Sequence, residues 1–448
     1  MINKFTDNKL LLIAIHIIIG YLATFTWFPK PFGLGVIGFC VFFVVKAKNN
    51  NEESFLLAMY IAGAEVFIRM TKGFVFYETG KYSVILLLIL GIFLGEFKQK
   101  FGVQYIFYLL LLTLGIVFTQ VPDGESIRNA IVFNLSGPVV LGVAALYFYK
   151  RPIKIETILN SLYFMILPIF SMIAFLYFRT PEISEIVFGG GANFETSGGF
   201  GPNQVATAIG VGIFIIIVFI VLKVKLTGFL FLDILFLAYF IFRGLLTFSR
   251  GGIITGFIAM IFFSFFYFLH KKGSLKLFFN YFLIGGIFII AIWVYTSNIT
   301  GGMLDNRYAG KNAIGVEKKD ITSGRLDILE EQLNSFLISP LGIGVGNGKF
   351  KRELSDKKIT AASHNEAGRL VEEHGIIGVV ILVGLMIIPL LNFFYFNNLQ
   401  RAFIISFYLF WILTINHSAM RIAFPGLVYA LSLIKIKEND YNTSIENE

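Results

Sequence analysis

The stretch QVATAIGVGIFIIIVFIVL, residues 204–222, contains no charged side chain, and its polar residues Gln204 and Thr207 lie near its start. At a helical rise of about 1.5 Å per residue, a run of this length reaches across most of the hydrocarbon core of a bilayer. Its apolar residues are continuous and do not alternate with polar ones, as they would in a transmembrane β-strand. The stretch therefore predicts a membrane-spanning α-helix, whose backbone hydrogen bonds are all made internally.

Similar runs recur along the whole chain of 448 residues, which is 56% hydrophobic and 15% charged, with a mean hydropathy of +0.77. This pattern predicts an all-α integral membrane protein, a polytopic helical bundle of about 12–14 transmembrane helices. The runs at 31–46 and 422–435 are short enough to be re-entrant, which explains the range. The expected spans are 9–27, 31–46, 54–70, 82–97, 104–119, 129–149, 158–179, 204–222, 227–244, 252–269, 277–296, 375–396, 402–417 and 422–435.

The runs divide the chain into three parts. Residues 1–296 are expected to form an N-terminal transmembrane bundle, and residues 297–374 one long extracytoplasmic loop that contains an amphipathic helix. Residues 375–448 are expected to form the C-terminal transmembrane helices and a short, disordered cytoplasmic tail from Lys435. No small-residue cleavage site follows the first run, which indicates a retained span. The single Cys40 excludes an internal disulfide framework.

The net charge of +9 does not indicate a nucleic-acid partner. The basic residues lie in the short loops between spans and not on one soluble face, which is typical of the positive-inside rule. If the N-terminus is cytoplasmic, most lysine and arginine residues outside the long loop fall on the cytoplasmic side. We therefore expect both termini in the cytoplasm. The loop 180–204, the turn TFSRGG at 247–252 and the long loop then share the extracytoplasmic face.

The turn TFSRGG provides the first candidate site residue, Arg250. An arginine beside an apolar helix is costly unless it faces a cavity or a partner. Ser249 and Gly251 flank it at the start of the next helix, where free backbone amides favour an anion. The alternative is an interfacial arginine whose charged head reaches to water. The glycine pair favours a functional role.

Arg325 opens the segment SGRLDILEEQ, residues 323–332. Leu326, Leu329, Leu333 and Phe336 recur at helical spacing, which predicts an amphipathic helix lying on the membrane surface. A cation in the first turn of a helix opposes the helix dipole, and a bound phosphate would relieve that conflict. A salt bridge to a neighbouring aspartate explains the residue equally well.

The rest of the long loop contains a glycine run and a histidine segment. Gly344 and Gly346 belong to PLGIGVGNG (340–348), where the backbone could approach a ligand closely or simply turn. His364 and Asn365 follow, and a neutral imidazole can take a proton from a sugar hydroxyl near pH 7. Glu373 could orient this histidine or an acceptor, or belong to an ordinary interfacial belt.

Two further polar residues fall on the same predicted face. Arg69 follows Glu65 at the i,i+4 spacing of a helix, which suits either substrate contact or a buried ion pair. Asn203, after Pro202, could hydrogen-bond a sugar or cap a helix. The chain contains no Asp-x-Asp, HExxH or Gly-x-Ser-x-Gly motif. We therefore predict neither a metal site nor a cofactor.

In order, the elements GPN, SRGG, SGR, PLGIGVG and HN…EEHGIIG, between Phe200 and Ile388, resemble the bacterial O-antigen ligase and O-antigen polymerase superfamily. The N-terminal half resembles it only in topology and hydropathy. The resemblance implies a multi-spanning inner-membrane enzyme that transfers a glycan from undecaprenyl diphosphate on the periplasmic face.

By the same resemblance, Arg250 and Arg325 would bind the donor diphosphate, and His364 would act on the acceptor hydroxyl. The chain departs from many relatives after Asn365, where Glu366-Ala367-Gly368 replace an aromatic residue and a leucine. That departure concerns the acceptor subsite.

The sequence thus favours an O-antigen ligase-like glycosyltransferase that is metal-independent and inverts the anomeric centre. Its partners would be an undecaprenyl-diphosphate-linked glycan donor, membrane lipid and an acceptor, which is lipid A–core for a ligase. A repeat-unit polymerase, whose acceptor is a second lipid-linked glycan, is the alternative. A transporter or flippase is the alternative from another class, although the chain lacks the inverted repeats of such proteins.

Overall fold

The structure is a computed structural model, which describes residues 8–96, 101–189, 191–271, 275–318, 320, 322, 324–354 and 363–437. It is 73% helical with almost no sheet, which confirms an all-α polytopic membrane protein. Both chain ends, which were predicted to be cytoplasmic, lie outside the described residues.

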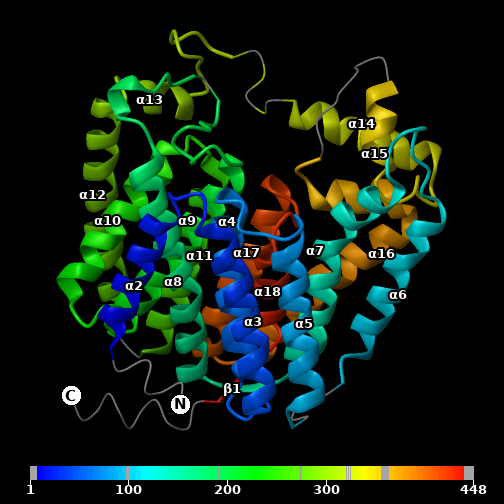
Figure 1. Ribbon diagram of the computed structural model, residues 1–448, viewed down its shortest axis with the longest axis horizontal. Coiled ribbons are helices and arrows are strands. Elements are labelled where there is room, and N and C mark those ends of the chain that lie inside the picture. Colours follow the sequence, from blue (N-terminus) through cyan, green and yellow to red (C-terminus); the bar gives the residue numbers. More distant parts are fainter. Residues whose placement is uncertain are drawn as a thin grey trace.

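The helices form one bundle with a cap of shorter helices at one end (Figure 1). The first half of the chain contains α2 (Lys9–Leu22), α3 (Pro29–Ala47), α4 (Glu53–Met70), α5 (Thr79–Leu94), α6 (Val103–Val117), α7 (Ile127–Phe148), β1 (Pro152–Lys154), α8 (Ile155–Arg179), η1 (Ile183–Glu185) and α9 (Pro202–Val221). The second half contains α10 (Leu230–Leu246), α11 (Arg250–His270), α12 (Leu275–Ile299), α13 (Met303–Tyr308), α14 (Arg325–Ile338), α15 (Asn347–Leu354), α16 (Glu366–Tyr395), α17 (Asn398–His417), α18 (Phe424–Leu431) and β2 (Lys435–Lys437).

Within the described residues, eight helices are long and apolar enough to cross a membrane, namely α3, α7, α8, α9, α11, α12, α16 and α17. The apolar helices α2, α5 and α6 are shorter, with 14, 16 and 15 residues. Membrane spans were also expected at the positions of these three helices and of α4 and α10. Three charged side chains interrupt α4, namely Glu53, Glu65 and Arg69, and all are buried.

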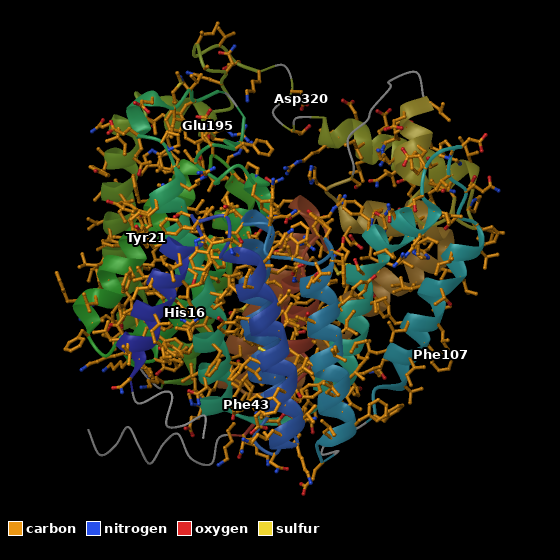
Figure 2. All side chains as sticks on the ribbon, in the orientation of Figure 1. His16, Tyr21, Phe43, Phe107, Glu195 and Asp320 are labelled. Carbon is orange, nitrogen blue, oxygen red and sulfur yellow. The ribbon has the colours of Figure 1, made fainter. Side chains whose placement is uncertain are left out.

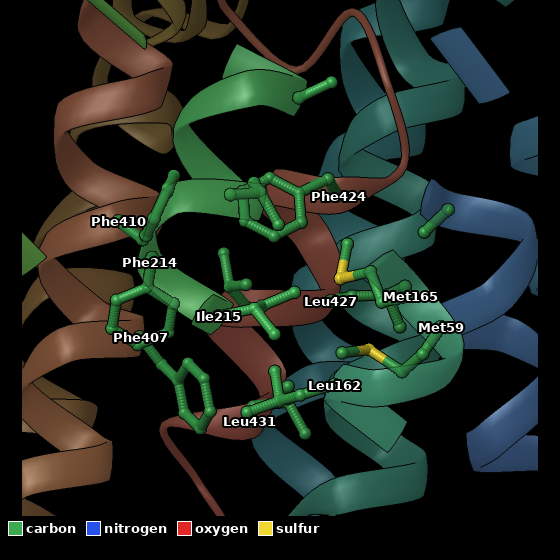
Figure 3. Close-up of a cluster of buried hydrophobic side chains, with 14 of the residues drawn as sticks. Met59, Leu162, Met165, Phe214, Ile215, Phe407, Phe410, Phe424, Leu427 and Leu431 are labelled. Carbon is green, nitrogen blue, oxygen red and sulfur yellow. The ribbon is translucent and has the colours of Figure 1, made fainter. Parts of the chain in front are cut away.

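Helix α18 occupies the centre of the bundle although it has only eight residues. A helix of this length is about 12 Å long and cannot cross a bilayer alone. Figure 3 shows its side chains Phe424, Leu427 and Leu431 packed among residues of α4, α8, α9 and α17. The run expected as a span at 422–435 is therefore a short helix held inside the protein, where neighbouring helices and not lipid surround it.

The two strands close the end of the bundle that lies opposite the cap (Figure 1). They pair in parallel, with Ile153 opposite Ile436. The prediction of a disordered tail from Lys435 is therefore wrong for residues 435–437, which gain backbone partners from β1. Figure 2 shows Glu195 and Asp320 at the cap end and Phe43 at the other end. The loops predicted to share one face thus lie at one end of the molecule.

Helix α16 contains a sharp kink at Gly375, whose φ is 61° and ψ is −138°. The Ile376 amide donates to the carbonyl of Pro340 across the kink at 2.8 Å. The apolar part begins here, where the span 375–396 was expected. The residues before the kink, which belong to the predicted extracytoplasmic loop, form a buried helical segment that carries the ion-paired side chains Arg369 and Glu373.

Candidate active site

A cavity of about 370 Å³ opens at the cap end of the bundle. Its walls come from the N-termini of α9 and α11, from α13 and α14, from the turn before α16, and from the C-terminus of α17. The described lining residues are Asn203, Ser249, Arg250, Gly251, Arg307, Thr322, Arg325, Leu326, Ile328, Leu329, Ser363, His364, Asn365, Asn416 and His417. The cavity thus collects segments from distant parts of the sequence.

The SRGG turn places Arg250 at the first residue of α11, facing this cavity. Ser249 precedes it as the N-cap residue, and its hydroxyl donates to Asn203 Oδ1 at 2.8 Å. A Cβ on Gly251 would lie 2.5 Å from the His417 ring, and one on Gly252 would overlap the backbone of α9. The glycine pair therefore lets α11 pack closely against α9 and α17, and this packing sets Arg250 at the cavity mouth.

Arg325 is the first residue of α14 and reaches the cavity from the opposite wall. The turn before it is fixed by Asp320, whose carboxylate accepts hydrogen bonds from the amides of Thr322 and Gly324. Gln332 holds α14 in place, since its Nε2 donates to Ser363 Oγ at 3.1 Å. Burial lowers the pKa of Arg325, and the nearby charge of Arg250 lowers it further. The two guanidinium groups therefore face one space.

Helix α14 forms where the amphipathic helix was expected. Ile328 and Gln332 are buried against the protein, whereas Leu326, Leu333 and Leu337 are exposed. The Nε2 of the buried Gln332 donates long-range hydrogen bonds to Ser363 and Glu372, which the spacing of the leucines does not reveal.

His364 lines the same cavity as Arg250 and Arg325. Its chain is held on both sides: Arg421 Nη2 donates to the Ser363 carbonyl at 2.8 Å, and the Asn365 side chain caps α16 by accepting from the Gly368 amide at 3.0 Å. Burial lowers the pKa of His364 to about 4, and the charges of Arg325 and Arg421 act in the same direction. The imidazole is therefore neutral at pH 7 and available as a proton acceptor.

The cavity also contains Arg307, from α13, which the sequence analysis missed. Its Nε donates to the Phe248 carbonyl at 3.0 Å, so α13 is tied to the SRGG turn. Burial lowers the pKa of Arg307, and Arg250 and Arg325 lower it further. No motif surrounds this residue. The one feature of the sequence that could have indicated Arg307 is its position in a polar segment next to an expected span.

Residues 235–383 match the O-antigen ligase family. This match supports membership of the O-antigen ligase and polymerase superfamily. Members of this family are glycosyltransferase-like ligases and polymerases, so the match supports an enzyme at this coarse level. The matched segment contains Arg250, Arg325 and His364, whereas Asn203 and Arg69 lie before it. No curated protein matches the chain.

The glycine run 340–348 lies outside the described lining of the cavity and contacts α16. The Gly344 amide donates to the Glu373 carbonyl at 3.1 Å, and the Gly346 amide donates to Glu373 Oε1 at 2.9 Å. Glu373 also pairs with Arg369 at 2.5 Å. The structure therefore brings Gly344, Gly346 and Glu373 together, but not into the described lining of the cavity.

Arg69 belongs to a buried charge cluster with Glu65, Glu78 and Lys81. Its Nη1 donates to the Arg421 carbonyl at 2.7 Å, and Glu65 accepts from the Ala423 amide at 2.6 Å. Arg69 thus lies outside the described lining of the cavity and is linked to it through Arg421, whose Nη2 donates to the Ser363 carbonyl. The described residues contain no group of three or more His, Cys, Asp or Glu that could hold a metal ion.

Proposed function

We propose that the protein transfers a glycan from an undecaprenyl-diphosphate donor to an acceptor hydroxyl at the extracytoplasmic face of the membrane. The observation that carries this proposal is the convergence of Arg250, Arg325 and His364, far apart in sequence, on one cavity. Two cations suit a diphosphate, and a neutral imidazole beside them suits proton removal.

The chemistry requires one bond to form and one to break. The acceptor oxygen attacks the anomeric carbon of the donor sugar from the side opposite the diphosphate, and a new glycosidic bond forms. The bond between the anomeric carbon and the phosphate oxygen breaks, and its electron pair leaves with undecaprenyl diphosphate. His364 takes the acceptor proton, and the anomeric configuration inverts.

In this proposal the arginines act on the leaving group. Arg250 and Arg325 neutralise the charge that develops on the diphosphate oxygen, which lowers the barrier to bond cleavage. The cavity lies at the end of α11 and α17, both of which are long enough to span the bilayer. The prenyl tail of the donor would therefore stay in the lipid while its diphosphate enters the cavity.

The test compares Arg250→Ala, Arg325→Ala and His364→Ala with the unaltered protein, at equal membrane levels, by transfer of glycan from the lipid-linked donor. We expect each arginine variant to lose roughly 10²-fold or more in rate. Lys349→Ala is the control, because Lys349 lies on α15 outside the described lining and pairs with Glu353 at 3.5 Å. Near-normal transfer by both arginine variants would rule out the proposal.

The acceptor is assigned as lipid A–core, in keeping with the ligase description of the matched family. Cells deleted for the gene test this assignment, by gel analysis of lipopolysaccharide and of lipid-linked intermediates. We expect long glycan to accumulate on the polyprenyl carrier while the core stays uncapped. Core that carries a single repeat would instead assign a polymerase, and an unchanged glycan profile would leave transfer to another acceptor or a transporter.

A further inference from the structure

Three guanidinium groups, not two, surround the cavity. Arg250 comes from α11, Arg307 from α13 and Arg325 from α14. Of the described residues that line the cavity, none is an aspartate or a glutamate. The cavity therefore gathers positive charge from three separate elements, which suits a polyanion.

Arg307 is fixed in this position by backbone geometry. Its Nε donates to the carbonyl of Phe248, the residue that precedes Ser249 and has a φ of 55°. A positive φ is uncommon for a bulky residue such as phenylalanine, so the turn is tightly constrained. The bond to Phe248 ties the third guanidinium to the same turn that positions Arg250.

The proposed reaction changes the charge of the diphosphate. In the donor both phosphates are esterified, one by the prenyl chain and one by the sugar, and the group carries two negative charges. When the bond between the sugar and the oxygen breaks, the terminal phosphate gains a third negative charge. Two arginines match the donor, and a third matches the leaving group.

We propose that Arg307 binds the terminal phosphate of the departing prenyl diphosphate and stabilises the third negative charge that forms on it. This inference rests on the proposed function and adds a residue to it. Because the interaction is stronger with the leaving group than with the donor, it accelerates the chemical step more than it tightens donor binding. Arg307 would thus act mainly on kcat.

The test uses purified full-length protein in liposomes with the lipid-linked glycan donor. Arg307→Gln removes the charge but can still donate to the Phe248 carbonyl, whereas Arg307→Lys keeps the charge. Lys311→Gln is the matched control, because it removes a cation from the same loop outside the described cavity lining. Farnesyl diphosphate, a short prenyl diphosphate with a free terminal phosphate, is the inhibitor that reports binding of the leaving group.

For Arg307→Gln we expect kcat to fall about 10-fold or more, the donor KM to change less than about threefold, and inhibition by farnesyl diphosphate to weaken about 10-fold. Arg307→Lys should recover much of both losses, and Lys311→Gln should behave like the unaltered protein. If Arg307→Gln retains kcat and farnesyl diphosphate binding while Arg250→Ala is inactive, this inference is wrong and the proposed function stands. If Arg250→Ala and Arg325→Ala are active as well, the proposed function itself fails.

Discussion

His364 is held neutral by its surroundings, because burial and the charges of Arg325 and Arg421 lower its pKa to about 4. A base must be deprotonated to accept a proton, so activity is lost only as the pH falls through the pKa. We therefore expect kcat/KM, which reports the free enzyme, to lack an acidic limb above about pH 5. Glycan transfer measured at low donor concentration across the pH range tests this.

The same residue should titrate differently once the donor is bound. The diphosphate brings negative charge next to Arg325, which offsets the cation and makes protonation of His364 easier. We expect the acidic limb of kcat, which reports the complex, to lie at higher pH than that of kcat/KM. An acidic limb of kcat/KM near the ordinary imidazole pKa of about 6.5 would contradict the assigned environment.

Individual residues were predictable from sequence to different degrees. Arg250, Arg325 and His364 were found because short motifs surround them and resemble those of a family. Arg307 was missed because its place in the cavity depends on a bond to the Phe248 carbonyl. Such a contact between a side chain and a distant backbone carbonyl leaves no periodic or local pattern in the sequence.

At the scale of elements, the kink at Gly375 separates the apolar part of α16 from the polar segment that begins next to His364. A Cβ on Gly375 would overlap the Pro340 carbonyl, and its φ of 61° with ψ of −138° suits only glycine. We expect Gly375→Ala to destabilise the protein by more than about 3 kcal/mol and to lower its yield in detergent extracts. The thermal melting temperature and the monodisperse fraction measure this.

Gly384→Ala is the matched control for this experiment. It lies in the same helix, and a Cβ there would meet nothing within 4 Å. Alanine is favoured over glycine in a helix interior by about 1 kcal/mol, so this variant should be as stable as the unaltered protein or slightly more stable. Equal behaviour of the two variants would mean that the kink is not required.

The elements themselves were predictable where the apolar runs are uninterrupted. The expected span 204–222 coincides closely with α9, and the expected span 375–396 begins at the kink in α16. The helical segment before that kink was assigned to the extracytoplasmic loop because its sequence is polar. Its burial depends on ion pairs such as Arg352 with Glu372 at 2.9 Å, which join residues that are distant in the chain. A hydropathy profile does not show that such charged residues pair with one another and can therefore be buried.

At the scale of the whole molecule, buried charges connect the bundle to the site. Arg69 and Glu65 on α4 hold the backbone of Arg421 and Ala423, and Arg421 in turn holds the carbonyl of Ser363 next to His364. Removing one partner of a buried ion pair is strongly destabilising, because the other partner remains as an uncompensated buried charge. The polar residues of α4 therefore link the N-terminal bundle to the C-terminal half that forms the cavity.

The membrane orientation is the last prediction, and the chain is well suited to testing it because its single Cys40 is buried. New cysteines can replace Ile314, which is 82% exposed in the long loop, and Lys225, which is exposed at the opposite end. The positive-inside bias predicts that a membrane-impermeant maleimide labels Ile314→Cys in intact cells and Lys225→Cys only after permeabilisation. The unaltered protein provides the background. If Lys225→Cys is labelled in intact cells and Ile314→Cys only after permeabilisation, the cavity faces the cytoplasm. The cavity could then not carry out glycan transfer at the extracytoplasmic face.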